Sequence, residues 1–320
     1  MSGPAPDILF HGIYAVTLVM LAFHWLGAFL KRKKLKTHWP RYLLLVVASA
    51  LAVSALVADY YYQPIVLAFF VFLFVFITLP GFCLAATPGI WRLELWKAAR
   101  WRLRLAAILD PTRPTRQFAK LAVAVEREAS GSGIALIESF ANDPDVGVIA
   151  LTFLGTFGDH WEDVIARTED HPAKASAAIR TVRARALGEV GRREEILAIA
   201  EAWGAFNRRN PYDKALLTYV AAFYGQREFF DRAWLRAFTI TPWRRDYWRT
   251  TADLYSGGEA ERNARRRFQS PAFEKYRRSL GALERRRHAT VKAPTDDECR
   301  RLDALAAKVP DDPREPRVYR

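Results

Sequence analysis

The run PIVLAFFVFLFVFITLP occupies residues 64–80 and carries no charged side chain. The next charge is Arg92, where the composition changes at once to WRLELWKAARWRLR, residues 91–104. An uncharged run of this length fits a bilayer core about 30 Å thick, which needs roughly 20 helical residues. Tryptophan mixed with Lys and Arg is typical of a membrane–water interface. The stretch predicts a membrane-spanning helix followed by a basic interfacial segment.

Two further apolar runs precede it, at residues 8–30 and 43–58. With the third run they predict a three-span membrane domain over residues 1–90. Pro80, Gly81 and Pro88 are expected to kink or end the third span, because proline cannot donate to the helical hydrogen-bond ladder. The first run lacks a basic segment before it, so it does not read as a cleavable signal peptide.

Positive charge sets the expected orientation. Residues 1–104 hold eleven Lys or Arg against three Asp or Glu, and the cationic groups gather after the first and third runs. By the positive-inside rule the N-terminus lies outside, and the chain from Trp91 onward is cytoplasmic, in a bacterial inner membrane.

The basic residues of these flanks are candidate contacts for anionic lipid headgroups. They are Lys31, Arg32, Lys33, Lys34, Arg92, Lys97, Arg100, Arg102 and Arg104. Apolar and basic positions in 91–104 do not separate around a helical period, so this segment does not read as an amphipathic membrane helix.

Few residues in the membrane half could carry chemistry. His11 and His24 fall in the first run, where an ionisable group is a functional candidate. No carboxylate accompanies them there, so neutral imidazoles packed between helices are favoured over a proton relay. Cys83 and Cys299 are too differently placed to predict a disulfide.

The second half reads as helical throughout. After a linker helix at 91–113, glycines open charged helix starts at Gly158, Gly191, Gly225 and Gly258, at intervals of 33, 34 and 33 residues. This is the period of a tetratricopeptide-like helical hairpin, and glycine is suited to the left-handed residue that ends the first helix of each pair. We therefore expect an all-α protein: three transmembrane helices, then a tetratricopeptide-like solenoid over 114–290. A short helix near 296–308 and an unstructured tail complete residues 291–320. A non-repetitive helical bundle is the alternative.

Residues 243–288 hold thirteen Lys or Arg against six Asp or Glu, densest at 265–267 and 285–287. No nucleic-acid-reading motif accompanies this charge, so we expect a solvated face or a face beside anionic lipid.

Phosphate-binding loops, metal-ligand spacings and cofactor motifs do not appear in the sequence. Gly131-Ser132-Gly133 reads as a turn between helices. We predict no catalytic residue, metal or cofactor.

Several patches, in the same order along the chain, are similar to the N-terminal accessory region of long bacterial rhomboid proteins, which are intramembrane serine proteases. The patches are Leu79–Gly81, Gly158–Ile165, Arg185–Gly191, Ala222–Gln226 and Tyr247–Ala252. The resemblance covers roughly residues 40–300 and implies three spans followed by helical repeats. The six-span catalytic core of that family has no counterpart here, and neither does its Gly-x-Ser nucleophile or partner histidine.

The leading hypothesis is a non-catalytic, membrane-anchored helical-repeat module whose cytoplasmic surface recruits or regulates a rhomboid-type core. Its expected partners are membrane lipids and that protein; nucleic acid is not expected. One alternative is membership of the protease family with the core missing from this chain. Another is a membrane-anchored assembly scaffold unrelated to proteolysis, with its repeats on the outer side.

Overall fold

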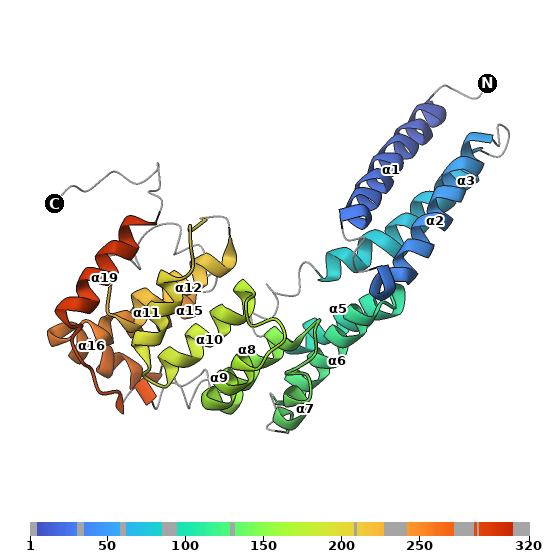
Figure 1. Cartoon of the computed structure of the whole chain (residues 1–320). Helices are drawn as coiled ribbons and strands as arrows, with labels where there is room; N and C mark the ends of the chain where they lie inside the picture. The colour runs from blue at the N-terminus through green and yellow to red at the C-terminus, as the bar shows by residue number, and fades with distance from the viewer. Residues whose placement is uncertain are drawn as a thin grey trace. The chain divides into compact units, whose positions relative to one another are not determined.

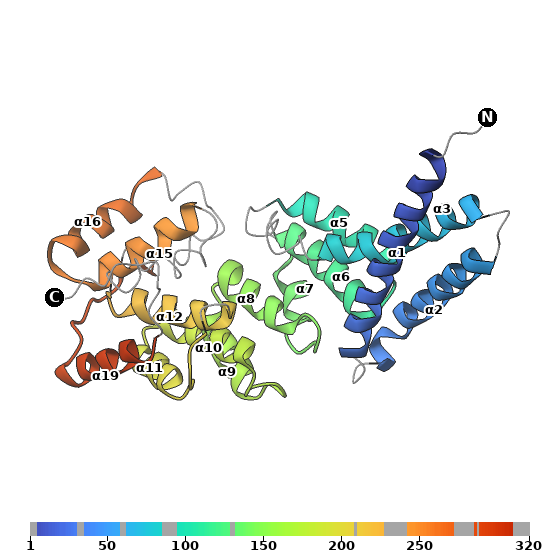
Figure 2. The same ribbon diagram turned by 90° about the horizontal axis from the view of Figure 1, so that it is seen from above.

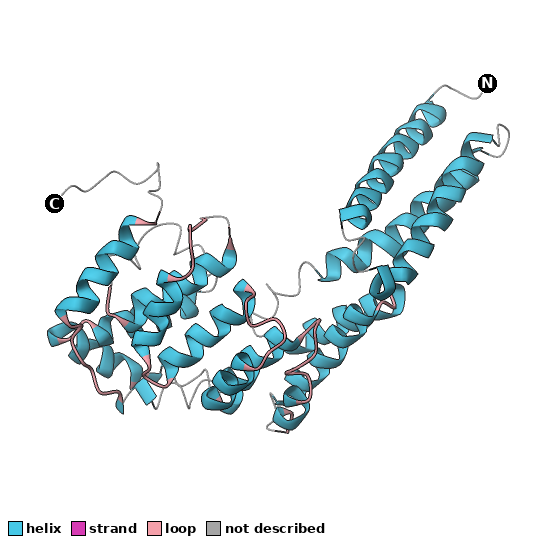
Figure 3. Cartoon of the chain, in the orientation of Figure 1, coloured by secondary structure: helices cyan, strands magenta, loops and turns pink. Residues whose placement is uncertain are grey.

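The computed structural model describes residues 5–30, 35–57, 62–84, 95–128, 132–207, 210–226, 242–271, 285–286 and 288–309. Every regular element in these ranges is a helix, and no strand occurs in them (Figure 3). The all-α class expected from the sequence is confirmed. The chain divides into two compact units, Met1–Arg127 and Glu128–Arg320 (Figure 1).

The first unit begins with three helices that coincide with the three apolar runs. They are α1 (Ala5–Leu30), α2 (Leu35–Val57) and α3 (Tyr62–Leu73). The third helix continues through the π-helical turn η2 (Phe74–Thr78) and stays helical through residues 79–84.

Pro80 and Gly81 do not end this helix. Proline at position 80 has no N–H, and its ring would clash with the carbonyl four residues earlier in a regular α-helix. The preceding turn is widened instead, and the Leu79 N–H donates to the Phe74 carbonyl, five residues back. Such π-turns are one of the local adjustments that let a helix pass a residue that breaks its regular ladder. Pro88 lies outside the described residues.

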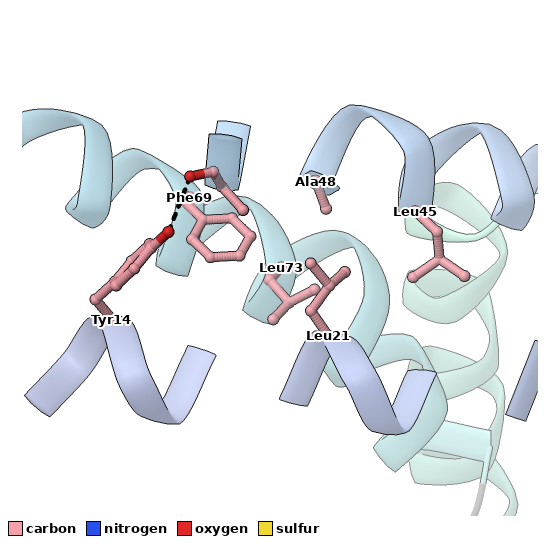
Figure 4. Packing of buried hydrophobic residues seen from close by; sticks show 7 residues of the cluster. Tyr14, Leu21, Leu45, Ala48, Phe69 and Leu73 are labelled. Atoms are coloured by element: carbon pink, nitrogen blue, oxygen red, sulfur yellow. Dashed lines mark hydrogen bonds between the residues drawn. The ribbon is translucent and has the colours of Figure 1, made fainter. Parts of the chain in front are cut away.

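Side chains from α1, α2 and α3 share one small core (Figure 4). It consists of Tyr14 and Leu21, then Leu45, Ala48 and Ala52, then Phe69 and Leu73. The Tyr14 hydroxyl donates to the Ala52 carbonyl at 2.9 Å, and its ring meets Phe69 edge-on at 6.2 Å between centroids. A buried phenol needs such an acceptor, so this bond fixes how α1 faces α2.

One helical stretch in the described residues, Leu67–Leu84, is long and apolar enough to cross a membrane by length and composition. The apolar stretches His11–Leu26 and Leu43–Ser54 are shorter. The expectation of three spans therefore stays a prediction.

Two amphipathic helices complete the first unit, α5 (Trp96–Leu109) and α6 (Arg113–Glu128). They lie side by side (Figures 1 and 2), and Arg100 on α5 forms a 2.6 Å ion pair with Glu126 on α6. The short link between them is buried at Asp110 and Thr112.

The second unit is built from helices joined by short turns. In chain order they are α7 (Ile134–Glu138), α8 (Gly147–Gly158), α9 (Trp161–Glu169), α10 (Ala177–Glu189), α11 (Arg193–Glu201), α12 (Pro211–Phe223), α15 (Pro242–Tyr255), α16 (Gly258–Phe268) and α19 (Asp296–Ala307). The α19 bounds confirm the short helix expected near residues 296–308.

Neighbouring helices of this unit pack in order along the chain. Helix α8 contacts α9 and α10, α10 contacts α11 and α12, and α12 contacts α15, which in turn contacts α16. Figures 1 and 2 show α8, α10, α12 and α15 following one another across the unit. Helical hairpins stacked on nearest neighbours are what the glycine period predicts, although the expected second helix after Gly225 lies outside the described residues.

Three of the four predicted turn glycines have left-handed backbone: φ is +85° at Gly191, +67° at Gly225 and +61° at Gly258. The first two close matching helix ends. The residue after each glycine donates its N–H to the carbonyl five residues back, Arg192 to Leu187 and Gln226 to Ala221, both at 2.8 Å. This is the Schellman arrangement.

Gly158 departs from the prediction. Helix α8 runs one residue further, and Asp159 takes the left-handed position with φ +59°. Aspartate is one of the few residues besides glycine that tolerate this conformation, because its short polar side chain can bond locally. Position 158 instead leaves no room for a larger residue, because the His160 ring packs against it. A Cβ there would lie 2.3 Å from His160 Cδ2.

Candidate functional site: an arginine-lined cavity

A cavity of about 360 Å³ opens where α10, α12 and α15 end, against residues 285–292. Its lining includes one carboxylate and four cationic side chains, together with two aromatic rings. These residues are Glu189; Arg193, Arg285, Arg286 and Lys292; Phe223 and Tyr255. The volume lies within the range of small-ligand pockets, and the lining has an excess of positive charge.

The floor of the cavity is a buried ion pair. Arg286 donates to Glu189 Oε2 at 2.7 Å, and only 1% of Arg286 and 3% of Glu189 are exposed. The Arg286 guanidinium also lies over the rings of Phe223, at 4.9 Å, and Tyr255, at 5.9 Å. Burying either charge alone would cost several kcal/mol, roughly, so each residue depends on the other.

Electrostatics in this pair keep the arginine charged. Burial alone would lower the pKa of Arg286, but the Glu189 carboxylate, followed by Tyr247 and Tyr255, raises it above its usual value. Burial raises the pKa of the neighbouring Tyr247 phenol to about 12, with Glu189 adding to the effect. Tyr247 is therefore a neutral hydrogen-bonding group at any physiological pH.

Arg285 is less well accommodated than Arg286. It pairs with Asp159 and lies 3.4 Å from Glu189 Oε2. Burial, with a smaller contribution from the adjacent charge of Arg286, lowers the pKa of Arg285 to about 10. An additional anionic group near Arg285 would be stabilised, because it would offset this unfavourable environment.

A third arginine supports the carboxylate from the other side. Arg185 lies one turn before Glu189 on α10, and its Nε atom is 3.8 Å from Glu189 Oε1. The Arg185 guanidinium lies 4.9 Å from the ring centre of Trp161 and 5.5 Å from that of Trp248. The Nε atoms of all three arginines and Glu189 Oε1 have no hydrogen-bond partner among the described residues. Buried polar atoms are ordinarily bonded, so these four atoms are exceptions within the described part of the unit.

The C-terminal segment forms one wall of the cavity and is tied down by arginines. Arg193 donates to the carbonyls of Lys292 and Ala293, at 2.5 and 3.0 Å, and to Glu298 at 2.9 Å. Arg301 binds Glu201 with two bonds of 2.7 Å. Helix α19 starts with a capping box between Thr295 and Glu298, so Glu298 both caps its helix and anchors it to α11.

The dense basic clusters seen in the sequence match the expected solvated face only in part, because Arg266 and Arg267 are exposed whereas Arg286 is not. Arg286 is buried, and Arg265 pairs with Glu261 and the Ala289 carbonyl, both at 2.7 Å. Arg266 bonds Asn263 at 2.7 Å, and Arg267 pairs with Asp246. Arg286 therefore lies inside the unit, whereas Arg266 and Arg267 make surface contacts. Arg287 lies outside the described residues.

The candidate lipid contacts are only partly visible. Lys31, Arg32, Lys33, Lys34 and Arg92 lie outside the described residues. On α5, Lys97 and Arg104 are exposed, whereas Arg100 is half-buried against Glu126 and Arg102 is half-buried over the Phe82 ring at 5.5 Å.

Other sequence candidates gain no chemical role from the geometry. His24 Nε2 lies 3.4 Å from Thr78 Oγ1, which places its ring between two helices as the packing interpretation expects. Ser132 lies between α6 and α7, as predicted for a turn. Cys83 and Cys299 form no disulfide. Within the described part of the chain, no group of three His, Cys, Asp or Glu side chains is arranged to hold a metal ion.

Glu189, which lines the cavity, and Arg185, which lies beside it, are the residues of this cluster that sequence reasoning missed. They stand in the patch Arg185–Gly191, quoted above only for its resemblance to rhomboid proteins, and Glu189 directly precedes the helix end at Val190 and Gly191. A carboxylate four residues after an arginine looks like a surface pair. Its partner Arg286 is 97 positions away, a separation that no local pattern reveals.

Comparison of the chain with known protein families, with curated proteins and with solved structures finds no match. The resemblance to rhomboid accessory regions therefore stays a prediction from the residues quoted above.

Proposed function

We propose that this chain is a membrane-anchored, non-catalytic interaction module. Helices α1 to α3 hold it in a bacterial inner membrane, and the second unit presents a protein-binding surface to the cytoplasm. By the resemblance, the partner is a rhomboid-type protease core.

The distribution of exposed apolar side chains carries the membrane part of this proposal. Among the described residues, nineteen of the 21 exposed large hydrophobic side chains lie between Val16 and Ile108. The described residues of the second unit contribute Leu136 and Tyr212. Helix α8 of this unit is strongly apolar, and none of its side chains is exposed. Helices whose inward and outward faces are both apolar are suited to an apolar environment, which the hydrocarbon core of a bilayer supplies.

By length alone, α1, α2 and the continuous helix over residues 62–84 could each span a bilayer. Helix α1 has 26 residues and α2 has 23, which at 1.5 Å per residue gives roughly 39 and 35 Å against a hydrocarbon core of about 30 Å. Basic residues follow the first and third helices in the sequence, at 31–36 and 92–104. This asymmetry supports a cytoplasmic second unit.

The arginine-lined cavity is the proposed docking point for the partner. Its cationic lining favours a segment that carries carboxylates, because a charge-assisted bond to arginine is among the stronger polar contacts. Lys292 stands exposed at its edge and can meet a partner without any rearrangement of the core.

Affinity purification from membranes tests this function. The chain is captured from mildly solubilised native membranes, and the eluate is labelled with a fluorophosphonate probe for active serine hydrolases. A labelled rhomboid-type membrane protein is expected to co-purify, and Lys292→Glu is expected to reduce its recovery severalfold. Lys308→Glu, an exposed lysine on the far end of α19, is the control and should leave recovery unchanged. Absence of any labelled partner, or equal recovery with both variants, contradicts the proposal.

A further inference from the structure

Helix α5 has a second apolar face that its own unit does not cover. One face is buried and consists of Trp96, Ala99, Leu103 and Ala106. Trp101, Leu105 and Ile108 recur at the same helical spacing on the opposite face and are 64%, 42% and 75% exposed. A tryptophan, a leucine and an isoleucine side by side on a surface mark an interaction site more often than chance exposure does.

Helix α5 lies next to the end of the candidate membrane span. Helix α5 contacts η2, and Arg102 places its guanidinium 5.5 Å from the ring centre of Phe82, two residues before the apolar helix Leu67–Leu84 ends. A spanning helix ends where hydrocarbon gives way to headgroups. The contact of Arg102 with Phe82 therefore places this part of α5 near the end of the candidate span.

The polar groups around the face suit an anionic surface. Lys97 and Arg104 are exposed on the same side of α5, and the guanidiniums of Arg100 and Arg104 lie 5.8 and 6.0 Å from the Trp101 ring centre. Tryptophan is enriched at the headgroup level, and long basic side chains can reach headgroups from a helix whose apolar side is inserted. No carboxylate occurs in α5.

On the membrane anchoring proposed above, we infer that α5 lies in the plane of the inner leaflet, with Trp101, Leu105 and Ile108 inserted at the headgroup–acyl boundary and Lys97 and Arg104 on anionic lipid phosphates. This revises the reading of residues 91–104 as lacking amphipathic character. The helix has two apolar faces with basic residues between them, so a single-face pattern cannot emerge from its sequence.

Depth-dependent quenching on the full chain tests this placement. Single cysteines are introduced as Leu105→Cys or Ile108→Cys in a Cys83→Ala, Cys299→Ala background, labelled with a small fluorophore, and reconstituted in phosphatidylcholine–phosphatidylglycerol vesicles. Matched controls are Val71→Cys, on the outward apolar face of α3, and Arg300→Cys, on α19. Quenchers are a nitroxide placed near the headgroup of the lipid and aqueous iodide.

Labels at 105 and 108 are expected to be quenched by the lipid nitroxide and protected from iodide, with the reverse at 300. Strong iodide quenching at 105 and 108 alongside lipid quenching at 71 overturns the inference and leaves the membrane anchor intact. Protection from both quenchers means that protein covers the face and also overturns it. Loss of lipid quenching at 71 as well overturns the membrane proposal itself.

Charge reversal separates electrostatic attraction from simple burial. Lys97→Glu with Arg104→Glu is expected to shift the balance between inserted and withdrawn α5 at least about tenfold toward the withdrawn state, since each basic group near an anionic surface contributes appreciably. Lys120→Glu, exposed on α6, is the control and should leave quenching at 108 as in the parent. An unchanged quenching ratio after the double reversal contradicts the role of anionic lipid.

Discussion

Glu189 is the residue on which the second unit's polar core depends. It bonds Arg286 at 2.7 Å, faces Arg285 and Arg185, and is buried with Arg286 under two aromatic rings. Such a pair adds little to stability compared with apolar side chains of the same volume, yet breaking it leaves an unpaired charge in the interior.

Glu189→Gln is therefore expected to lower the free energy of unfolding by about 3–5 kcal/mol, because it strands the charge of Arg286. Chemical denaturation of the full chain in detergent, followed by tryptophan fluorescence, measures this. Glu195→Gln is the matched control: it removes an exposed partner of Arg192 on the neighbouring helix and should change little. Similar losses in both variants would show that Glu189 has no special role. A second change, Arg286→Met, should restore part of the loss in Glu189→Gln.

Two turn glycines share a backbone conformation and differ in their surroundings. A Cβ on Gly225 would lie 2.5 Å from backbone atoms of Tyr255 and Ser256, whereas nothing lies within 4 Å of one on Gly191. Gly191→Ala is thus expected to cost only the left-handed strain, about 1–2 kcal/mol, and Gly225→Ala more, because two backbone segments must separate. Thermal unfolding of the two variants makes the comparison. Equal costs would mean that the close approach at Gly225 does not constrain the turn.

At the scale of elements, charged contacts tie α19 to the rest of the second unit, in addition to its buried Leu302 and Leu305. Burial alone would raise the pKa of Glu298, but the hydrogen bond from the Thr295 N–H and the charge and hydrogen bond of Arg193 lower it overall. A hydrogen bond from Arg301 lowers the pKa of Glu201. Both carboxylates therefore favour the docked helix in their ionised form.

A lowered carboxyl pKa gives a definite direction of pH dependence. The stabilisation from Glu298 is complete above the ordinary glutamate pKa of 4.5 and is lost as the pH falls through the lower value of the folded state. The melting temperature of the full chain should thus fall as the pH drops below 4.5 toward the lower folded-state pKa, and Glu298→Gln should flatten this dependence. Glu259→Gln, which removes an exposed carboxylate on α16, should keep the slope of the parent. An unchanged slope in Glu298→Gln would contradict the tie between α19 and α11.

The helices themselves could be predicted from the sequence, because apolar runs and glycine spacing are local signals. Gly191 and Gly225 end their helices as expected. Gly158 does not, because Asp159 adopts the left-handed backbone conformation in its place. The cavity could not be predicted in this way. It depends on Glu189 meeting Arg286 across 97 positions, and on the packing of Phe223 against Gly188, where a Cβ would lie 2.1 Å from the ring. Neither contact leaves a periodic trace.

At the scale of the whole molecule, the two units differ in how many apolar side chains their described residues expose. Exposed apolar side chains are frequent through Ile108 and nearly cease in the described residues beyond it. The chain should accordingly stay with membranes after an alkaline wash that strips peripheral proteins, whereas release into the supernatant would contradict an integral anchor. Immunoblotting of the two fractions decides between these outcomes.

Labelling of Cys299 tests the central claim most directly, because this exposed cysteine reports the side of the membrane on which the second unit lies. The full chain with Cys83→Ala is produced in bacteria and treated with a membrane-impermeant maleimide, in spheroplasts and in inverted vesicles. The account predicts labelling in inverted vesicles and protection in intact spheroplasts. Labelling in intact spheroplasts would contradict it and favour a scaffold whose helical hairpins lie on the outer side.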